Sequence, residues 1–359
     1  MSARTFALVA AGGTGGHVFP AVAVAESLVT RGHAPSSIRF VTESRELSTK
    51  SIARAGFEFD VLPLQHGLRR RLSAENFRVL AQFVASLLVA WRLLRRHRPQ
   101  IVIGFGAYVS LPVVVVARLR RVPVVVHEQN GHPGIANRIA VALGARPAVS
   151  LPGTPLRGAQ VTGNPVRPAI SAVHRNPQTP PLVVVTGGSL GSELLNTATL
   201  DLADRWATRR DVAIRHVTGT RFIDECVAAR ADRASALLDY NAVGFEHDMA
   251  ALYSRAAVLV GRSGGMVAEL CAAGVPSVLV PWSGATGDHQ GANARILAEA
   301  GAAVVVPEAE CGGDELARVL DALLADPAAL AAMSDAARGL GRPEAADAVA
   351  TLVEAAARP

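Results

Sequence analysis

The sequence predicts an α/β protein of two domains, each a parallel sheet with helices on its faces. Its 359 residues are too many for one ordinary core and suit two domains of about 150 residues each. Short runs of β-branched residues alternate with helical segments, which is typical of parallel strands buried on both faces. The order strand, glycine turn, helix, which opens a βαβ unit, occurs twice. We therefore expect two Rossmann-like halves with a cleft between them.

The first of these units stands near the start of the chain. Residues 5–11 form an apolar run, a glycine turn occupies residues 12–17, and a helical pattern begins at Pro20 and ends at Gly32. Proline suits the first turn of a helix and glycine suits its end. Further strands are predicted at residues 38–42, 101–105 and 122–128.

The second unit opens the other half of the chain. Residues 182–188 form a strand with a glycine pair, and a helical stretch begins at Glu193. Residues 166–181, rich in proline and polar side chains, have the composition of a linker. Further strands are predicted at residues 212–219, 256–261, 275–281 and 302–307. We place the domains at 1–165 and 166–342 and expect a last helix, at about 343–359, that can pack back on the first domain.

Composition limits the class of protein. No run reaches about 18 uncharged apolar residues, and the start lacks a signal-peptide pattern, so we expect a soluble or peripheral protein of the cytoplasm. Cys226, Cys271 and Cys311 are widely spaced, as expected of reduced thiols without a structural metal. The formal charge of +6 favours anionic partners: nucleic acid, phosphate-bearing substrates or an acidic membrane. Because Lys50 is the only lysine, a GC-rich genome that favours arginine is an alternative explanation of the lysine scarcity.

The glycine turn at residues 12–17 is suited to an anion, since its backbone can approach a ligand closely and its N–H groups can face a phosphate. It does not match the G-x-G-x-x-G dinucleotide fingerprint, and Glu43 is poorly spaced for a ribose, which argues against NAD or FAD. His17 stands at the start of the predicted helix, where the helix dipole favours the neutral imidazole that a general base requires. The alternative is that His17 only caps or packs the turn.

A second glycine turn follows the predicted strand at residues 256–261. Ser263, Gly264 and Gly265 would open a helix whose N-terminus can hold a diphosphate, and Glu269 lies about one turn further in. A carboxylate there can accept hydrogen bonds from both hydroxyls of a ribose. The alternative is that Glu269 only complements the helix dipole.

Other polar residues stand where strands or domains end. Residues 288–290 and Asn293 follow the strand at 275–281 and suit a sugar ring, although a solvated loop would have the same composition. Arg167 lies at the domain junction, where a guanidinium can neutralise phosphate charge. The polar run 127–130 ends a buried strand, and such residues usually line a site.

Taken together, these motifs resemble those of glycosyltransferase family 28, bacterial enzymes that transfer N-acetylglucosamine from UDP onto lipid I to make lipid II for peptidoglycan. The resemblance covers residues 6 to 305 and rests on GGTGGHVFP, GFGAYVSLP, HEQNG with Asn137 downstream, GNPVR, GGSLG, RSGG with the following Ala-Glu, and the DHQ segment with Asn293. It implies a GT-B fold, an inverting transfer and peripheral attachment to the cytoplasmic face of the bacterial cell membrane. Leu190, His289 and an RSGG segment one residue short depart from the family pattern around the sugar pocket.

The resemblance also implies partners and contact residues. The partners are UDP-N-acetylglucosamine, lipid I and an anionic membrane surface, with other proteins of cell-wall synthesis as further candidates and no nucleic acid. The acceptor and the reacting sugar are expected to meet His17, Tyr108, His127, Glu128 and Asn137, with Thr14, Gly15, Gly16 and Asn130 beside the donor sugar. Donor binding is expected at Arg167, Ser189, Glu246, Arg262, Ser263, Gly264, Gly265, Glu269, Gln290 and Asn293, with the backbone near Phe245 holding the uracil.

The implied reaction needs a single base. A UDP-sugar is α-linked, so inversion is one in-line displacement, for which we predict His17 as the base and Tyr108 or Glu128 as alternatives. The helix start at Ser263, together with Ser189 and Arg167, would stabilise the departing UDP. No carboxylate pair of the D-x-D kind stands out, so we expect no cofactor and no divalent metal.

A segment rich in arginine and apolar residues predicts contact with a membrane. Arg69, Arg70, Arg71 and Leu72 precede an apolar helical stretch that contains Phe77 and ends in further arginines. This pattern suits a helix lying on anionic lipid, with Leu72, Phe77 and the arginines among the headgroups. The alternative is that the helix packs on the first sheet and its arginines are solvated. Much of its apolar face must pack on the sheet in either case.

Three other functions compete with this prediction. Another GT-B transferase would act on a glycolipid or a natural product. A UDP-N-acetylglucosamine 2-epimerase would need several carboxylates around the cleft, which the sequence does not offer. A non-catalytic nucleotide-binding protein would bind UDP equally well after a His17→Ala substitution.

Overall fold

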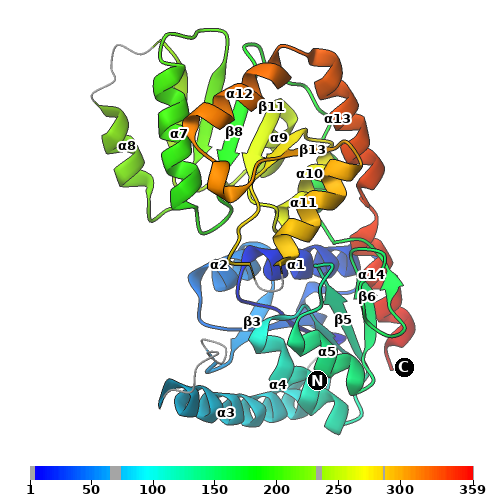
Figure 1. The fold of residues 1–359 in the computed structure, drawn as a ribbon. Coiled ribbons are helices and arrows are strands. Elements are labelled where there is room, and N and C mark those ends of the chain that lie inside the picture. The colour runs from blue at the N-terminus through cyan, green and yellow to red at the C-terminus, as the bar shows by residue number, and fades with distance from the viewer. Residues whose placement is uncertain (1–4, 65–73, 232–236, 286–287, 359) are drawn as a thin grey trace. The chain divides into compact units, whose positions relative to one another are not determined.

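A computed structural model shows the chain as two compact units, the first formed by residues 1–167 with 342–359 and the second by residues 168–341. The structure describes residues 5–64, 74–231, 237–285 and 288–358, and for residues 74–78 the backbone alone. Each unit is a parallel sheet flanked by helices (Figure 1). The predicted fold class is therefore confirmed.

The first unit is built on a sheet in the order β3-β2-β1-β4-β5-β6-β7, with every pair parallel. The order reverses between β1 and β4, so the chain winds outward from these two neighbouring strands. The strands are β1 (Ala7–Ala10), β2 (Ile38–Thr42), β3 (Glu58–Val61), β4 (Ile101–Gly104), β5 (Val124–Glu128), β6 (Arg146–Val149) and β7 (Gln160–Val161). The helices are α1 (Gly15–Thr30), η1 (Pro35–Ser37), α2 (Glu46–Arg54), α3 (Ala74–His97), α4 (Ala107–Leu119), α5 (Ile135–Ala142) and α14 (Ala345–Ala356).

Alternation along β1 explains how this sheet is covered on both faces. Ala7 and Val9 belong to a core cluster that also contains residues of α1 and α14, whereas Leu8 and Ala10 belong to a cluster with residues of α3 and α4. Successive side chains of a strand point to opposite faces, so a continuous apolar run serves both layers. Helix α14 returns from the end of the chain and fills the first layer with Val349, Ala350 and Val353.

The second unit repeats the plan in the order β10-β9-β8-β11-β12-β13, again all parallel. Here the order reverses between β8 and β11. The strands are β8 (Leu182–Thr186), β9 (Ala213–Val217), β10 (Asp239–Val243), β11 (Ala256–Gly261), β12 (Ser277–Leu279) and β13 (Ala303–Val305). The helices are α6 (Pro168–Ser171), α7 (Glu193–Arg205), α8 (Ile223–Ala231), α9 (Met249–Arg255), α10 (Met266–Ala273), α11 (His289–Glu299), η3 (Glu308–Glu310), α12 (Gly313–Leu324) and α13 (Pro327–Leu340).

The structure departs from the expected elements in three places. It adds the strands β3, β6, β7 and β10, and it places the short helix α6 inside the expected linker. Residues 289–293, expected in a loop, begin helix α11 instead. Across the described residues, no helix combines the length and apolar character that a membrane crossing requires.

Candidate active site

Each of the two predicted glycine turns follows a strand at which the sheet order reverses, β1 in the first unit and β11 in the second. Parallel α/β sheets bind ligands there, because the loops at the carboxyl ends of these two strands diverge and leave a crevice. In the first unit the glycine turn follows β1, and Gly106 follows β4 with a φ of +79°. A Cβ built on Gly106 would lie 3.4 Å from His17 Cδ2 and 3.5 Å from Asn137 Nδ2. The structure therefore brings His17, Gly106 and Asn137 together.

His17 lies in the first turn of α1, with its ring directed back along the glycine turn. Its Nδ1 is 3.3 Å from Thr14 Oγ1, while Nε2 is the ring nitrogen nearer to Gly106. Gly15 and Gly16 form the start of the same helix. His17 therefore lies at the N-terminus of α1, beside the glycine turn.

A buried carboxylate stabilises the conformation of the glycine turn. Glu43, at the end of β2 and only 4% exposed, accepts hydrogen bonds from the Gly13 N–H at 2.9 Å and the Ser48 hydroxyl at 2.7 Å. A Cβ on Gly12 would lie 1.7 Å from Glu43 Oε2, so any side chain there would displace the Glu43 carboxylate. Arg45 adds a bond from Nη1 to the Gly13 carbonyl at 2.9 Å.

Glu128 organises the polar loop that follows β5. Its buried carboxylate accepts four hydrogen bonds, from the Asn130 N–H and amide, the Gly134 N–H and the Asn137 amide, at 2.9–3.2 Å. The Asn137 amide also donates to the His127 carbonyl at 3.0 Å. Because both carboxylate oxygens are occupied in this way, the geometry gives Glu128 a structural role in the loop.

His127 is fully buried, unlike a side chain that meets an acceptor. Gln129 Nε2, a donor, lies 3.2 Å from its Nδ1, which must therefore accept, so Nε2 carries the proton and donates to the Gly163 carbonyl at 2.9 Å. Burial lowers the pKa of His127 to about 4. The buried His127 ring therefore stabilises the loop. Tyr108, in the first turn of α4, is by contrast 53% exposed.

Arg167, expected at the donor phosphates, packs within the first unit. Its guanidinium lies over the ring of Phe19, 5.0 Å from the centroid. Burial raises the pKa of Glu26, and the positive charge of Arg167 opposes this rise. Within the first unit, Arg167 therefore lies beside helix α1.

In the second unit, Arg262 links the loops that follow three neighbouring strands through hydrogen bonds. It follows β11, its Nη2 donates to Ser192 Oγ after β8 at 3.0 Å, and its Nη1 donates to the Val280 carbonyl after β12 at 3.1 Å. Ser189 lies in the first of these loops and is partly exposed. Ser189 and Arg262 therefore lie at the reversal point of the second sheet, in the loops that follow β8 and β11.

The start of α11 is bound to the second glycine turn. The buried Ser263 hydroxyl donates to the Gln290 carbonyl at 2.8 Å, and the Asn293 amide donates to the Ser263 carbonyl at 3.0 Å. Gln290 Oε1 accepts from the Trp282 N–H at 2.9 Å, and its Nε2 lies 3.9 Å from a Cβ built on Gly264. Gly265 caps helix α10 next to this contact.

Two further carboxylates of this unit are held by arginine. Glu246, after β10, pairs with Arg215 Nη2 at 2.7 Å, and Glu308 pairs with Arg262 Nη2 at 2.7 Å. Burial alone would raise the pKa of both carboxyls. Hydrogen bonds from Arg215 to Glu246, and from Ser283 and Arg262 to Glu308, instead hold both pKa values below the ordinary range.

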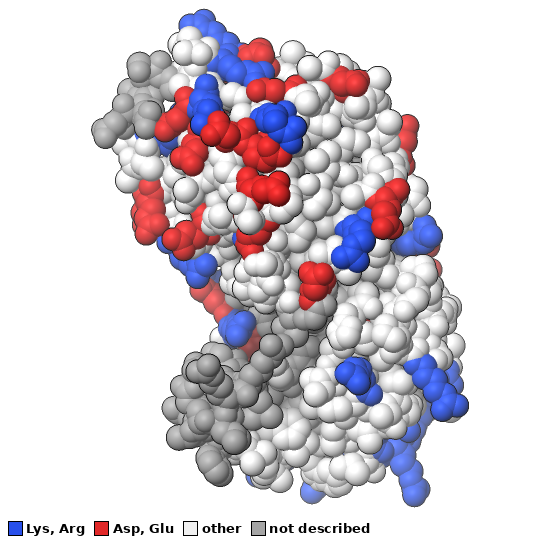
Figure 2. Space-filling view, in the orientation of Figure 1, with Lys and Arg blue, Asp and Glu red and all other residues white. Residues whose placement is uncertain are grey.

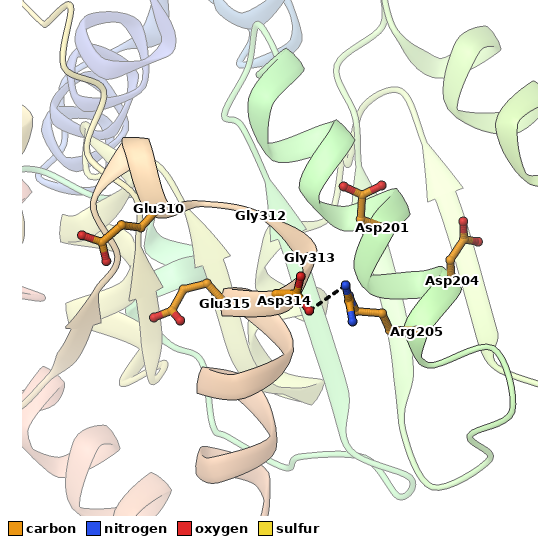
Figure 3. Close-up of a pocket in the computed structure, with 8 residues that line it drawn as sticks. All are labelled: Asp201, Asp204, Arg205, Glu310, Gly312, Gly313, Asp314 and Glu315. Carbon is orange, nitrogen blue, oxygen red and sulfur yellow. Dashed lines mark ion pairs between the residues drawn. The ribbon is translucent and has the colours of Figure 1, made fainter.

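The pocket of about 560 Å³ between α7 and α12 is not this site (Figure 3). Its lining is acidic, with one ion pair between Arg205 and Asp314 at 2.6 Å. Figure 2 shows acidic side chains of the second unit in red. Carboxylates repel a diphosphate, and none of the predicted site residues lines the pocket. A second pocket of about 500 Å³ lies beside Ser283 and Glu308, close to the network of Arg262.

Several residues at the two sites are not predicted from the sequence. Glu43 follows β2 at the same sheet edge as the glycine turn, and that placement is a signal that could have found it. Tyr253, whose hydroxyl donates to Glu269 Oε2 at 2.8 Å, lies within helix α9 and belongs to no motif. The expected membrane residues Arg69, Arg70, Arg71 and Leu72 lie outside the described residues, as does the side chain of Phe77.

Comparison with known proteins gives matches over both units. The models named glycosyltransferase family 28 N-terminal domain and C-terminal domain match residues 7–146 and 182–349. A UDP-N-acetylglucosamine–N-acetylmuramyl-(pentapeptide) pyrophosphoryl-undecaprenol N-acetylglucosamine transferase of Alkalilimnicola ehrlichii is 39% identical, covering 96% of this chain and 97% of its own. An enzyme of the same name from Desulforudis audaxviator is 37% identical, with 97% of each chain covered. The crystal structure of Acinetobacter baumannii MurG superposes with a TM-score of 0.76 at 27% identity, covering 98% of this chain and 99% of that one.

Proposed function

The chain belongs to glycosyltransferase family 28, and from this membership we propose that it transfers N-acetylglucosamine from UDP-N-acetylglucosamine to the C4 hydroxyl of N-acetylmuramic acid in lipid I, forming lipid II. The observation that carries the proposal is the 36–39% identity, over nearly the whole chain, to enzymes named for this transfer. The polar loops at the reversal points of both sheets support it, since each offers one substrate a place at a strand end.

His17 acts as the base in this proposal. The ring sits at a helix N-terminus beside Gly106 and the Asn137 amide, where a sugar hydroxyl can donate its proton to a neutral imidazole. Glu128 is already the acceptor of four hydrogen bonds, so it holds the loop that presents Asn137. Tyr108, exposed in the first turn of α4, is the remaining alternative base.

The departing UDP is stabilised by the second unit. The backbone N–H groups at the start of α10 suit an anionic diphosphate, and Ser189 and Gln290 flank the same turn as donors to the phosphates and the sugar. Glu269 accepts hydrogen bonds from the ribose, and the backbone near Glu246 holds the uracil. These donors need no divalent metal, so we expect transfer to continue in EDTA, and a complete loss of turnover there would contradict the proposal.

The test offers the protein UDP-N-acetylglucosamine with a short-chain lipid I analogue and follows the release of UDP. We expect release only when both substrates are present. The substitution His17→Ala should lower kcat by a factor of about 100 or more, because a positioned base contributes about 10²–10⁴, while UDP still binds. The exposed His174 of the second unit supplies the control His174→Ala, which should keep full activity. UDP release without the acceptor, or with a different glycolipid only, would refute the assignment.

We also propose that the protein attaches to the membrane through helix α3. Leu80, Val84, Leu88 and Trp91 recur at helical spacing on one side of α3 and are 43–57% exposed, whereas Ala90 and Leu94 are buried in the sheet layer. Arg92, Arg95 and Arg96 are exposed at the end of the helix. An apolar stripe bordered by arginines suits an anionic lipid surface, such as the cytoplasmic face of a bacterial membrane.

A further inference from the structure

Tyr253 of helix α9 is the largest side chain in a set that the structure buries completely, with 0% of its surface exposed. Its hydroxyl donates to Oε2 of Glu269 at 2.8 Å. A buried hydroxyl destabilises the fold unless it is hydrogen-bonded, so the position of Glu269 and the burial of Tyr253 depend on each other.

Glu269 is partly exposed, and it lies in the first turn of α10 directly after the glycine turn. A carboxylate can accept about four hydrogen bonds, so it can accept the Tyr253 hydroxyl and still accept two hydroxyls of a ligand. A glutamate on a helix surface otherwise samples several rotamers, and ordering it on binding opposes affinity. The bond from Tyr253 fixes one carboxylate oxygen before any ligand arrives.

We propose that Tyr253 is a positioning residue that orients Glu269 to accept both ribose hydroxyls of the nucleotide. The inference rests on the proposed function, which places the ribose of a uridine diphosphate at Glu269. Tyr253 lies outside the loops at the strand ends. Its role can be measured separately from catalysis, as the preference of the binding site for a nucleotide that carries both ribose hydroxyls.

The experiment compares the binding of UDP and 2′,3′-dideoxy-UDP to the full chain by calorimetry. Tyr253→Phe keeps the packing of the ring and removes only the hydroxyl. We expect UDP to bind about tenfold more weakly to this variant, the range for losing a hydrogen bond to a charged group, while the affinity for dideoxy-UDP stays the same. The preference for the ribose hydroxyls should therefore fall by the same factor.

The chain offers a matched control in Tyr240, whose hydroxyl lies 2.7 Å from His216 Nδ1 in the same unit. Tyr240→Phe makes the same chemical change and should leave the preference unaltered. In Glu269→Gln, where the carboxylate is lost, adding Tyr253→Phe should produce no further loss of preference.

Two results would overturn the inference, and they can be told apart. If Tyr253→Phe weakens both nucleotides equally, or neither, while the wild-type chain prefers UDP, then Tyr253 only supports the fold. If the wild-type chain binds no UDP, the proposed function fails and the inference fails with it.

Discussion

Glu43 shows how one buried side chain can set the shape of a glycine turn. It holds the Gly13 N–H and the Ser48 hydroxyl, and its own carboxylate occupies the space that a side chain at residue 12 would need. In a dinucleotide-binding fold an acidic residue near this position binds a ribose. Here the acid at the same edge of the sheet is hydrogen-bonded to the glycine turn itself.

We predict that Glu43→Ala lowers the free energy of unfolding by about 2 kcal/mol, because it leaves a buried N–H and a buried hydroxyl without their acceptor. Since the turn carries Thr14 and His17, kcat should fall as well. Urea denaturation and the UDP-release assay measure the two effects. Glu46→Ala is the control, because this carboxylate is exposed and pairs only with Lys50 on the surface. Equal stabilities of the two variants would contradict the role of Glu43.

Two buried histidines predict a dependence of stability on pH. Burial lowers the pKa of both His127 and His216 to about 4, whereas in an unfolded chain the value is about 6.5. Between these values the unfolded state binds more protons, so stability falls as the pH drops from about 6.5 towards 4, by about 1.4 kcal/mol per pH unit for each histidine. Above this window the contribution is constant.

Urea denaturation across this pH range would measure the slope. His216→Gln should reduce it by the share of one histidine, and the exposed His174→Gln should not change it. A slope that neither His127→Gln nor His216→Gln alters would rule out this explanation.

At the level of secondary structure, the sequence predicts the central strands and the edge strand β13, and misses β3, β6, β7 and β10. β1, β4, β5, β8 and β11 are continuous apolar runs, because parallel strands covered on both faces need them. β3 and β7 lie at edges or near them, carry polar or exposed residues, and so lack that signal. Their strand conformation comes from pairing with a neighbour, which local composition does not encode.

The same reasoning explains which parts of the site could be predicted. Glycine turns and polar runs after strands are local features, so the sequence alone offers His17, Glu128, Ser263 and Glu269 as candidates for the site. The burial of His127 and the contact of Arg167 with Phe19 depend on segments far apart in the chain. Side-chain direction at such positions is a tertiary property that spacing alone does not fix.

Helix α3 carries a prediction about the membrane. Replacing Leu80 and Leu88 by glutamate should reduce co-sedimentation with vesicles containing anionic lipid by about tenfold, since it removes apolar contact area and adds repulsive charge. Val61→Glu, at a similarly exposed position on β3, is the control and should bind like the wild type. Binding that is indifferent to anionic lipid content would contradict the proposed surface.

Over the full length of the chain, the first unit is assembled from both ends. Arg31 of α1 pairs with Asp347 and Glu354 of α14, each at 2.7 Å. On the same helix, Val349 and Val353 are buried in the core. The exposed ion pairs add little to stability. The apolar contact between the two helices contributes more, at about 25 cal/mol per Å² of buried apolar surface.

We therefore predict that the double variant Val349→Ala, Val353→Ala destabilises the first unit by about 3 kcal/mol, from lost burial and the cavities left behind. Hydrogen exchange in β1 and β2 should report this loss, while exchange in β8 and β11 stays unchanged. Thr351→Ala, on the exposed side of the same helix, should alter neither. Equal acceleration of exchange in both units would show that their stabilities are not separate.

The return of α14 also bears on the order in which the protein is made. Residues 168–341 form one uninterrupted stretch, so every residue of the second unit is synthesised before α14. The layer over α1 must wait for its last helix. The usual order, in which the leading domain matures first, is therefore closed to this chain, because the first unit is complete only once α14 has been made.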